Sequence, residues 1–377
     1  MLDPDRIVNN TSSIIGQAKA KSVFAQSLSS GKMAQSWIFV GPKGVGKSSF
    51  AHYVIRELLA DSVSLDQSAP DVPSSPSESS MGLFGDLMPA AEAAPAQPEI
   101  PADLHHPDHP VYRKIHTKSH PDFLSIGIDP NSEKKKSELS VDEIREVSLF
   151  LRGTSSTGGW RVVLIDDAEC MNKNAANALL KILEEPPPKS MIILIASTLG
   201  YFPPTIRSRC RVLPFQHLSD ADVSQYLTAN HPAVMESDRS IITTLASGSI
   251  GQLNMIIQSG GLELFHDVRK LLDRADDKTQ FWPAAHNIAE KMEKQPDIAP
   301  VIFNKIIEKA IFGGAPGSAK PAANDGFQSL CTRLLRQKSV PQWLDYYSDM
   351  QQLVGKQQFL YLDAKQTWLG LLGRLAA

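Results

Sequence analysis

A phosphate-loop pattern follows a short apolar run near the start of the chain. Residues 41–48 read Gly-Pro-Lys-Gly-Val-Gly-Lys-Ser, which fits GxxxxGK(S/T), and they come directly after the apolar residues 37–40. This motif needs a buried strand before it and a helix after it, because its glycines let backbone N–H groups turn inward around phosphate oxygens at a helix N-terminus. A helical pattern over 47–59 fits that helix. The segment therefore predicts an α/β nucleotide-binding domain; the alternative is a chance match of its four fixed positions.

Other apolar runs predict the remaining strands of a sheet. Together with residues 37–40 they are 123–126, 161–165 and 191–196. Their apolar residues follow one another rather than alternate with polar ones, which is typical of strands buried on both faces of a parallel sheet. Helical patterns lie between the strands at 47–59, 141–151 and 174–185, and prolines at 186–188 stop the last one. We expect a parallel sheet with helices on both faces.

After about residue 214 the strand-like runs end and the pattern is helical. Helices are expected over 220–230, 238–247 and 252–258, with a turn at 248–251, and almost throughout from 263 onward. An apolar stripe at helical spacing predicts a core face and consists of Leu360, Ala364, Trp368, Leu371, Leu372 and Leu375. Trp343, Tyr346 and Tyr347 are interpreted as core or subunit packing, because no basic cluster lies beside them.

Composition excludes several classes of protein. Hydrophobic residues make up 42% of the 377 and charged residues 21%, a globular balance that rules out a fibrous or wholly disordered chain. The net charge of −3 argues against a protein that coats nucleic acid by bulk positive charge. No apolar run approaches the roughly 18 residues of a membrane span, and the N-terminus lacks a secretory pattern. The three cysteines contain no CxxC pair, so we expect a cytoplasmic protein without disulfides or a thiolate zinc site.

Residues 61–110 differ in composition from the rest of the chain. They hold nine of its 26 prolines, together with serine-rich and alanine-rich stretches. Such a segment buries too little apolar area to offset chain entropy, so we predict a flexible insertion within the first domain. It contains one apolar island, residues 81–88, which is interpreted as part of a linker or as a short docking motif for a partner.

The loop and a later strand together predict a nucleotide site. Lys47 is placed to reach the β- and γ-phosphates, and Ser48 to hold Mg²⁺. Residues 161–165 are followed by Asp166 and Asp167, the form of a Walker B segment, in which Asp166 orients the hydration shell of Mg²⁺ and Asp167 stands where a water-polarising carboxylate is needed. An ordinary strand end with solvated acids is the alternative. The expected cofactor is ATP or ADP with Mg²⁺, and its candidate binding residues are Gly41, Gly44, Gly46, Lys47, Ser48, Ser49 and Asp166, with Ser48 and Asp166 on the metal.

Four further segments resemble one known family. They are Asn174-Ala-Ala-Asn-Ala-Leu-Leu-Lys-Ile-Leu-Glu-Glu-Pro-Pro187 after the Walker B segment, Ile14-Ile-Gly-Gln17 before the loop, Ser119-His-Pro-Asp-Phe123, and Thr205-Ile-Arg-Ser-Arg-Cys210. Together they are similar to bacterial DNA polymerase III clamp-loader subunits, which are AAA+ proteins. The resemblance runs from about residue 10 to 260 and continues weakly to the end.

The resemblance implies an architecture, a function and a set of partners. It implies an α/β AAA+ P-loop domain over 1–214 that contains the insertion, a small helical lid over 215–260 and an all-α collar domain over 261–377. The assembled loader, with gamma/tau and delta subunits as partners, opens the sliding clamp and places it on primed DNA at the cost of ATP. Thr198 falls in the sensor region of this fold and joins the nucleotide-binding candidates.

Three departures bear on which subunit the chain is most like. The family usually carries a four-cysteine zinc module where the insertion stands, and no zinc is expected here. Motor subunits carry a glutamate at the position of Asp167 and a lid arginine at the position of Gly251. These changes favour the delta prime type and predict weak or absent ATPase activity of the chain's own site, with Asp167 as its catalytic candidate. A gamma/tau-like motor subunit is the alternative.

Arg209 is a candidate that acts outside its own site. In the family, the second arginine of a segment such as 205–210 resembles a finger that projects into the ATP site of a neighbouring subunit. A guanidinium stays ionised and offers planar donors that match phosphate oxygens, so it can neutralise charge as the γ-phosphoryl group leaves. The structural alternative is an arginine that caps the connection between strand and helix or pairs with an acid. Arg207 and Arg211 are the other finger candidates.

Other functions and sites are set against this interpretation. A free-standing P-loop enzyme would need its own lid base or arginine, and a scaffold without nucleotide would not need the intact residues 46–48. Five of the ten histidines fall within 105–120, but their spacing mixes loop and proline-broken chain and no thiolate supports a zinc site, so we interpret them as a surface tract. The lysines at 134–136 are interpreted as a solvated turn rather than a DNA patch.

Overall fold

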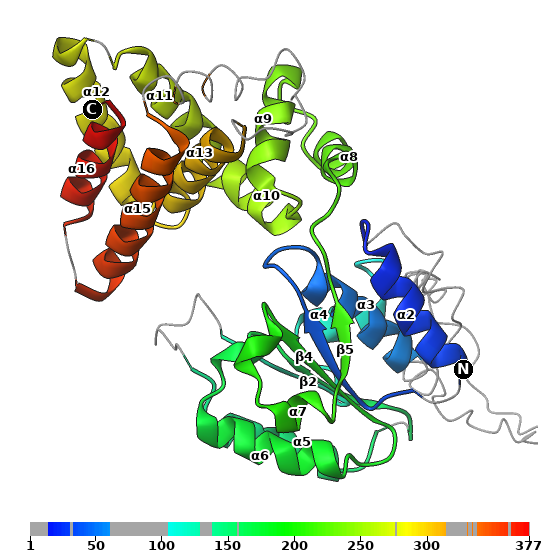
Figure 1. Ribbon diagram of the computed structural model, residues 1–377. Helices are drawn as coiled ribbons and strands as arrows, with labels where there is room; N and C mark the ends of the chain where they lie inside the picture. Colours follow the sequence, from blue (N-terminus) through cyan, green and yellow to red (C-terminus); the bar gives the residue numbers. More distant parts are fainter. Residues whose placement is uncertain are drawn as a thin grey trace, which may run out of the picture. The chain divides into compact units, whose positions relative to one another are not determined.

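The chain divides into two compact units (Figure 1). The first consists of Met1–Pro42 and Lys47–Phe215, and the second of Lys43–Gly46 and Gln216–Ala377. The computed structural model describes residues 14–30, 33–60, 105–128, 138–156, 158–275, 277–313, 330, 334, 338–360 and 363–376. Most of the predicted insertion, including its island at 81–88, and the lysines at 134–136 lie outside these residues.

A five-stranded parallel sheet forms the centre of the first unit. Its strands are β1 (Ser36–Val40), β2 (Phe123–Ile126), β3 (Arg161–Ile165), β4 (Ser190–Ala196) and β5 (Arg211–Pro214). They lie in the order β2-β3-β4-β1-β5, so β4 separates the strand before the phosphate loop from the strand before the Walker B acids. In the register, Val40 pairs with Ala196 and Ile165 with Leu194. The expected parallel sheet is confirmed.

Four strands match their predictions to within one residue at each end, but β5 was not predicted. It is an edge strand whose neighbour is β1, and Arg211 and Pro214 interrupt its apolar pattern. Proline is tolerated at a sheet edge because its missing N–H is not needed by a second neighbour. Two contacts hold the Arg211 side chain. Its Nη1 donates a hydrogen bond to Ser27 Oγ at 2.8 Å, and its guanidinium forms a cation–π contact with the Trp37 ring.

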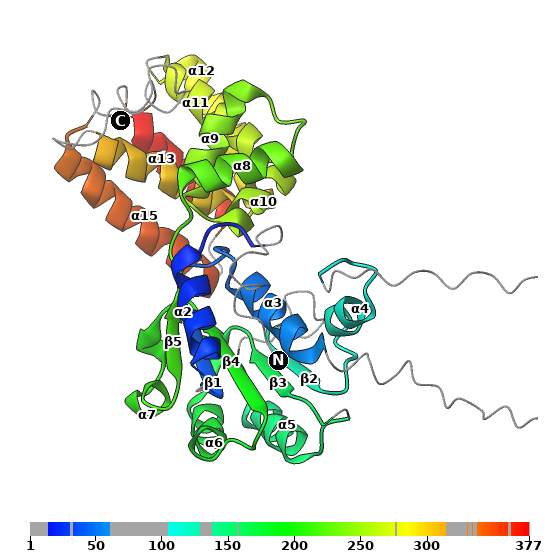
Figure 2. The same cartoon turned by 90° about the vertical axis from the view of Figure 1, so that its right-hand side faces the viewer.

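Helices cover both faces of the sheet, as expected (Figure 2). On one face lie α2 (Ala18–Ser29) and α3 (Lys47–Leu59), whose Phe24 and Phe50 pack against Trp37 and Phe39 of β1. On the other lie α5 (Val141–Arg152) and α6 (Lys173–Glu184), in the apolar cluster that contains Ile38. Successive residues of β1 therefore face opposite layers and all are buried, which explains why the strand is apolar along its length.

Local sequence explains where the helices of this layer begin and end. A capping box starts α5, in which the backbone N–H of Ser140 donates to Oε2 of Glu143 at 2.9 Å. Asn172 caps α6 by accepting from the backbone N–H of Ala175 at 2.9 Å. α6 ends at Glu184, before the three prolines that were predicted to stop it.

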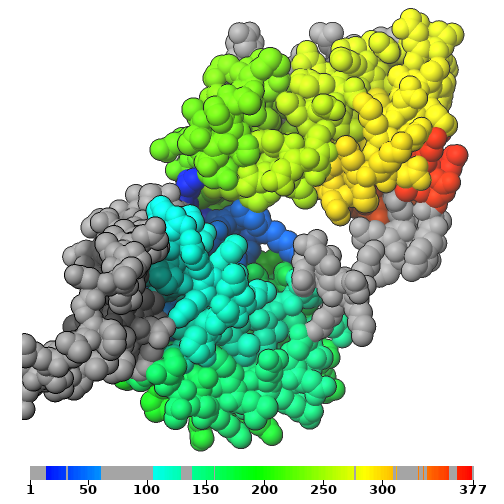
Figure 3. All heavy atoms as spheres, turned by 180° about the vertical axis from the view of Figure 1, so that it is seen from behind, coloured from blue at the N-terminus to red at the C-terminus, as the bar shows by residue number. Residues whose placement is uncertain are grey.

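Shorter helical elements connect the strands of the first unit. They are α4 (Pro110–His116), α7 (Pro204–Arg207) and the 3-10 turns η2 (Ala168–Cys170) and η3 (Leu199–Tyr201). η2 and η3 follow β3 and β4 directly, and α7 leads into β5. The segment that contains α4 and β2 is cyan in the space-filling view and forms part of the surface of this unit (Figure 3).

Where the second unit is described, it is helical. Its helices are α8 (Asp220–Asn230), α9 (Glu236–Ala246), α10 (Ile250–Gln258), α11 (Gly261–Asp273), α12 (Lys278–Lys294), α13 (Ala299–Gly313), α15 (Val340–Leu360) and α16 (Ala364–Ala376). One apolar cluster joins α8, α9 and α10, and a larger one runs from α9 to α16. The predicted stripe is confirmed for four of its six residues, since Trp368, Leu371, Leu372 and Leu375 on α16 are each no more than 2% exposed. Ala364, the first residue of α16, is half-buried, and Leu360 belongs to α15, so the stripe does not run along a single helix.

The predicted turn at 248–251 is too long. α10 begins at Ile250, because Ser249 caps it by accepting from the backbone N–H of Gln252 at 3.1 Å. The division of residues 215–377 into a lid and a collar domain stays a prediction. None of the helices in the described part of the chain is both long and apolar enough to cross a membrane.

Candidate nucleotide site and arginine finger

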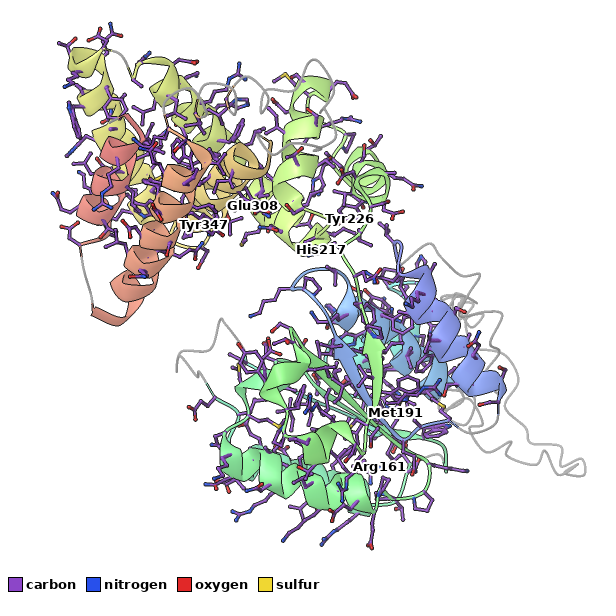
Figure 4. The ribbon with its side chains drawn as sticks, in the orientation of Figure 1. Arg161, Met191, His217, Tyr226, Glu308 and Tyr347 are labelled. Carbon is purple, nitrogen blue, oxygen red and sulfur yellow. The ribbon has the colours of Figure 1, made fainter. Side chains whose placement is uncertain are left out.

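The ends of three strands carry the candidate residues of the first unit. Gly41 follows β1, Asp166 follows β3 and Thr198 follows β4. Because the strands are parallel, these ends lie on the same edge of the sheet, and the backbone N–H of Gly41 donates to the last carbonyl of β4 at 3.3 Å. Arg161 and Met191, at the starts of β3 and β4, mark the opposite edge (Figure 4).

Lys47 is buried within the phosphate loop. Its Nζ donates to the carbonyl oxygen of Gly41 at 2.6 Å and to that of Pro42 at 2.7 Å, and the residue is 7% exposed. The loop itself therefore holds the ammonium group close to the end of β1. Phosphate oxygens would accept hydrogen bonds from the same Nζ of Lys47. Bonds between an ammonium and a charged phosphate are stronger than bonds from the ammonium to neutral carbonyl oxygens.

The backbone of the loop has the shape that a phosphate cradle requires. Gly44 and Gly46 adopt positive φ angles of 76° and 99°, which residues with side chains rarely do. A Cβ atom at Gly46 would meet nothing within 4 Å, so the backbone there faces open space. Ser48 and Asp166 are half-buried and offer the hydroxyl and carboxylate oxygens that Mg²⁺ prefers, while Ser49 is exposed. These residues fit a nucleotide with Mg²⁺.

The tip of the loop, Lys43–Gly46, groups with the second unit. There the backbone N–H of Gly251 donates to the carbonyl oxygen of Gly44 at 3.0 Å, and Oγ of Ser249 donates to that of Lys43 at 3.0 Å. A Cβ atom at position 251 would lie 2.7 Å from the Cα of Gly44, so a side chain there would push the loop aside. Gly251, the position at which the resemblance predicts an arginine in motor subunits, makes a backbone contact in this chain.

A tight turn follows β3 at the two Walker B acids. The backbone N–H of Asp166 donates to the carbonyl oxygen of Ile126 at 2.8 Å, and that of Asp167 donates to Oδ1 of Asp166 at 3.0 Å. Asp167 is left-handed, with φ 48° and ψ 42°, a conformation that aspartate tolerates better than most residues. Both side chains are half-buried at the strand end.

Glu169, which the sequence analysis did not single out, holds the end of β4. Its Oε2 accepts from the backbone N–H of Ser197 at 2.8 Å, and its Oε1 accepts from the Ser197 hydroxyl at 2.7 Å. The next residue, Thr198, is exposed and caps η3 by accepting from the N–H of Gly200 at 3.4 Å. Glu169 thus ties the turn after β3 to the strand end that carries Thr198. No sequence pattern signals a pair whose members are 28 residues apart.

His52 is a second residue that the sequence analysis missed. It lies on α3, and its ring makes an edge contact with Phe123 at a centroid distance of 6.0 Å. Burial lowers its pKa to about 4, the charge of Arg56 adds to the lowering, and Asp166 opposes it. The imidazole is therefore neutral at neutral pH and adds no positive charge beside the Walker B acids.

Arg209 places a guanidinium on the surface directly after α7. Its Nη1 donates to the carbonyl oxygen of Thr205 at 3.0 Å and to Oγ of Ser208 at 3.4 Å, and its Nη2 forms an ion pair with Oε1 of Glu184 at 2.9 Å. The side chain is 35% exposed. The next residue, Cys210, is buried in the α5–α6 cluster, and burial raises the pKa of its thiol to about 12. Exposure suits a finger, and the ion pair is the contact that the structural alternative predicts.

The other two arginines of the segment differ in their surroundings. Arg207 is exposed at the end of α7, whereas Arg211 is engaged with Ser27 and Trp37 in the edge of the sheet. Arg211 therefore has a role in the fold, and Arg209 is the arginine that directly precedes the buried cysteine.

The interpretation of the histidines as a surface tract is wrong for several of them. His105 stacks on Tyr53 at 4.1 Å, and its Nε2 lies 2.8 Å from Oε1 of the buried Glu57. His109 is 7% exposed and caps α4 by accepting from the backbone N–H of Val111 at 3.2 Å. These hydrogen-bonding contacts hold the rings of His105 and His109 against their neighbours in the fold. Within the described residues, no three or more histidine, cysteine or acidic side chains are grouped so that they could hold a metal ion.

The central part of the chain matches known proteins. Residues 100–219 match the family described as DNA polymerase III, delta subunit. The delta prime subunit of DNA polymerase III from Pseudomonas aeruginosa is 41% identical over 92 residues, 24% of this chain and 27% of that protein. Delta prime from Escherichia coli K12 is 33% identical over 144 residues, 37% and 40% of the two chains. The gamma subunit from Buchnera aphidicola subsp. Schizaphis graminum is 28% identical over 214 residues, 57% and 47%.

The sheet, the phosphate loop and these matches define a class of protein. The fold is a parallel α/β sheet with a phosphate loop after β1, and the matched segments are similar to subunits of bacterial DNA polymerase III, which confirms the resemblance seen in the sequence. Within that class, identity is higher to delta prime and the match to gamma is longer. The matched segments span less than half the length of each of these relatives.

Proposed function

We propose that this chain is a delta prime-like subunit of a DNA polymerase III clamp loader, which helps the complex place a sliding clamp on primed DNA. It assembles with gamma/tau and delta subunits and meets the clamp and the DNA as part of that complex. The observation that carries the proposal is Arg209, an exposed cation held on a turn by the buried Cys210, in a segment that lies within the family match.

Arg209 acts in trans on a neighbouring ATPase site. In phosphoryl transfer the protein supplies positioning and charge stabilisation rather than covalent chemistry, and an arginine from a neighbour is one of the recurring parts. The short, helical α7 and the buried Cys210 fix the backbone on either side of Arg209, so the guanidinium reaches outward from a rigid base. An isolated neighbour lacks this cation, which makes ATP turnover depend on assembly.

The chain's own site binds ATP or ADP with Mg²⁺ but turns ATP over slowly. The backbone cradle, Lys47 and Ser48 are sufficient for binding, and the bound metal would neutralise phosphate charge. Turnover needs more: a placed carboxylate and cations on the developing charge. Asp167 is one methylene shorter than glutamate and lies in a left-handed turn, and position 251 makes a backbone contact with Gly44 that has no room for an arginine.

A gamma/tau-like motor subunit is the second candidate. It is favoured by the intact Gly46-Lys47-Ser48 and by the longer match to the gamma subunit, 57% of this chain. The two candidates differ in one measurable property: a motor subunit hydrolyses ATP in its own site, and a delta prime-like subunit does not need to.

The proposal is tested by assembly and by loading. The purified chain is mixed with gamma/tau and delta subunits, and the mixture is run on gel filtration and then assayed for clamp loading on primed DNA. We expect the chain to enter the complex and loading to require it. A complex that forms without the chain and loads clamps at the same rate contradicts the proposal.

A further inference from the structure

Glu184 and Arg209 form an ion pair that joins two separate elements of the first unit. Glu184 is the last residue of α6, and Arg209 follows α7; Oε1 and Nη2 are 2.9 Å apart. We infer that Glu184 is a positioning residue for Arg209, holding the guanidinium ready in one orientation before a neighbouring subunit docks. This inference rests on the proposed role of Arg209 as a finger.

The location of Glu184 is unfavourable for the helix that carries it. The C-terminus of a helix is the negative end of its dipole, and acidic side chains are disfavoured there. α6 nevertheless ends in Glu184 and is capped by Glu185, two acids in succession. A local choice that conflicts with helix stability points to a role elsewhere, and the contact that Glu184 makes is with Arg209.

The contacts of Arg209 hold the guanidinium at its two terminal nitrogens. Nη1 bonds to Thr205 O and Ser208 Oγ within its own turn, and Nη2 is held by Glu184 from α6. The contacts within the turn reach only Nη1, so they leave the guanidinium some freedom to rotate. The ion pair between Nη2 and Glu184 holds a second nitrogen and fixes the plane of the guanidinium. A guanidinium has five N–H donors, and with 35% of the side chain exposed some remain for phosphate oxygens.

Pre-orientation matters because arginine has many rotamers. Free side chains of this length lose much conformational entropy when they are fixed in a site, and a group held beforehand loses less. Glu184 is half-exposed, at 50%, so its pair with Arg209 has the strength of a surface ion pair. If the pair positions Arg209 for ATP turnover, losing a pair of this strength should lower the turnover rate about two- to fivefold.

The test begins in the free chain, where it does not depend on any partner. Guanidinium resonances of Arg209 are followed by NMR in the wild type, in Glu184→Ala and in the matched control Glu185→Ala. Glu185 is the adjacent residue and an exposed acid, and within the described part of the chain it forms no ion pair. We expect slowed rotation of the Arg209 guanidinium in the wild type and in Glu185→Ala, and faster rotation in Glu184→Ala, which keeps only the contacts of Nη1. Free rotation in the wild type overturns the inference. Equally slow rotation in Glu184→Ala also overturns the inference.

The second arm measures steady-state ATPase of the reconstituted loader. Glu184→Ala should lower kcat about two- to fivefold with little change in KM for ATP, because the finger acts on the departing phosphoryl group. Glu184→Gln keeps an acceptor oxygen but not the charge, so its kcat should lie between those of the wild type and Glu184→Ala. The loss in Glu184→Ala should shrink as salt is raised, because salt screens the pair. Glu185→Ala should match the wild type.

The double variant separates this inference from the proposed function. If Glu184 acts through Arg209, then Glu184→Ala with Arg209→Ala is no slower than Arg209→Ala alone. A further loss in the double variant, or unchanged kcat in Glu184→Ala when Arg209→Ala is slow, overturns the positioning role and leaves the finger intact. If Arg209→Ala itself is as active as the wild type, the finger role fails and the positioning role fails with it, whatever the NMR shows.

Discussion

The carboxylate of Glu169 accepts two hydrogen bonds from Ser197, one from the backbone N–H at 2.8 Å and one from the hydroxyl at 2.7 Å. This contact ties the turn after the Walker B acids to the end of β4, so two strand ends of the candidate site are held together by one side chain. Glu184 and Arg209 repeat the arrangement, because there too an acid from one element holds a polar group of another.

Replacing Glu169 should loosen this edge of the sheet. We expect Glu169→Ala to lower the free energy of unfolding by about 1–3 kcal/mol, because the backbone N–H of Ser197 loses a charged acceptor. Urea denaturation of the purified chain measures the change, with Glu185→Ala, an exposed acid, as the control. A Glu169→Ala variant as stable as the control would show that water replaces the carboxylate without cost.

Lys47 should be required for nucleotide binding. Its ammonium is held 2.6 and 2.7 Å from two carbonyl oxygens of the loop, beside the place where phosphates would enter. Isothermal titration should show binding of ATP and ADP with Mg²⁺ to the wild type and none to Lys47→Ala. Lys43→Ala, an exposed lysine of the same loop, is the matched control and should bind as the wild type does. Equal binding by Lys47→Ala would place the nucleotide elsewhere.

Asp122 should be one of the most sensitive positions of the first unit. It is 1% exposed and accepts hydrogen bonds from Ser156 N–H and Oγ at 3.1 and 2.6 Å, with Arg161 Nε 3.7 Å away. Asp122→Ala leaves the largely buried Arg161 without its carboxylate, and we expect a loss of about 3–5 kcal/mol in stability. Asp142→Ala, which breaks an exposed pair with Arg145, should change stability by less than about 1 kcal/mol. Similar losses in both variants would contradict this account.

The pH dependence of stability should carry a contribution from His52. Burial lowers its folded pKa to about 4, whereas the unfolded value is near 6.5. Between these values the unfolded chain binds more protons than the folded one, so stability falls as pH drops through 6.5 and the loss levels off near 4. The full effect is up to roughly 3 kcal/mol. Urea midpoints from pH 7 to 4.5 should fall less steeply in His52→Gln than in the wild type; parallel curves would contradict the assignment.

Much of the fold is readable from the sequence because apolar periodicity reports burial. The four continuous apolar runs became β1 to β4, and α3 and α8 have the predicted bounds. β5 escaped because an edge strand tolerates charge and proline, and the pattern carries no sign of the contacts that hold Arg211. The histidines were misread for a related reason, since rings of this kind can be buried by contacts with residues far away in sequence, such as Glu57.

The sequence predicts candidate residues for the site but not the contacts among them. The loop pattern predicts Lys47 and Ser48 as nucleotide-binding residues, and the acids after β3 add Asp166 and Asp167; these roles stay predictions. The partners of these groups, Glu169 for the end of β4 and Glu184 for Arg209, come from side-chain directions that depend on how the helices pack. The sequence shows a glycine at position 251, where the resemblance predicts an arginine in motor subunits. Only the backbone contact between Gly251 and Gly44 shows why a larger residue does not fit there.

The central claim is that Arg209 serves the ATP site of a neighbouring subunit, and ATP turnover by the assembled loader tests it most directly. Steady-state ATPase in the presence of clamp and primed DNA is compared for complexes that contain wild-type chain, Arg209→Ala or the exposed neighbour control Arg207→Ala, with assembly checked by gel filtration. Fingers supplied in trans are worth roughly 10³–10⁵ in rate at a single site, and the remaining sites of the complex reduce the observed fall. We predict that Arg209→Ala leaves the complex intact and lowers its turnover several-fold, whereas Arg207→Ala does not. Unchanged turnover in an intact Arg209→Ala complex would contradict the claim and assign this arginine to the fold.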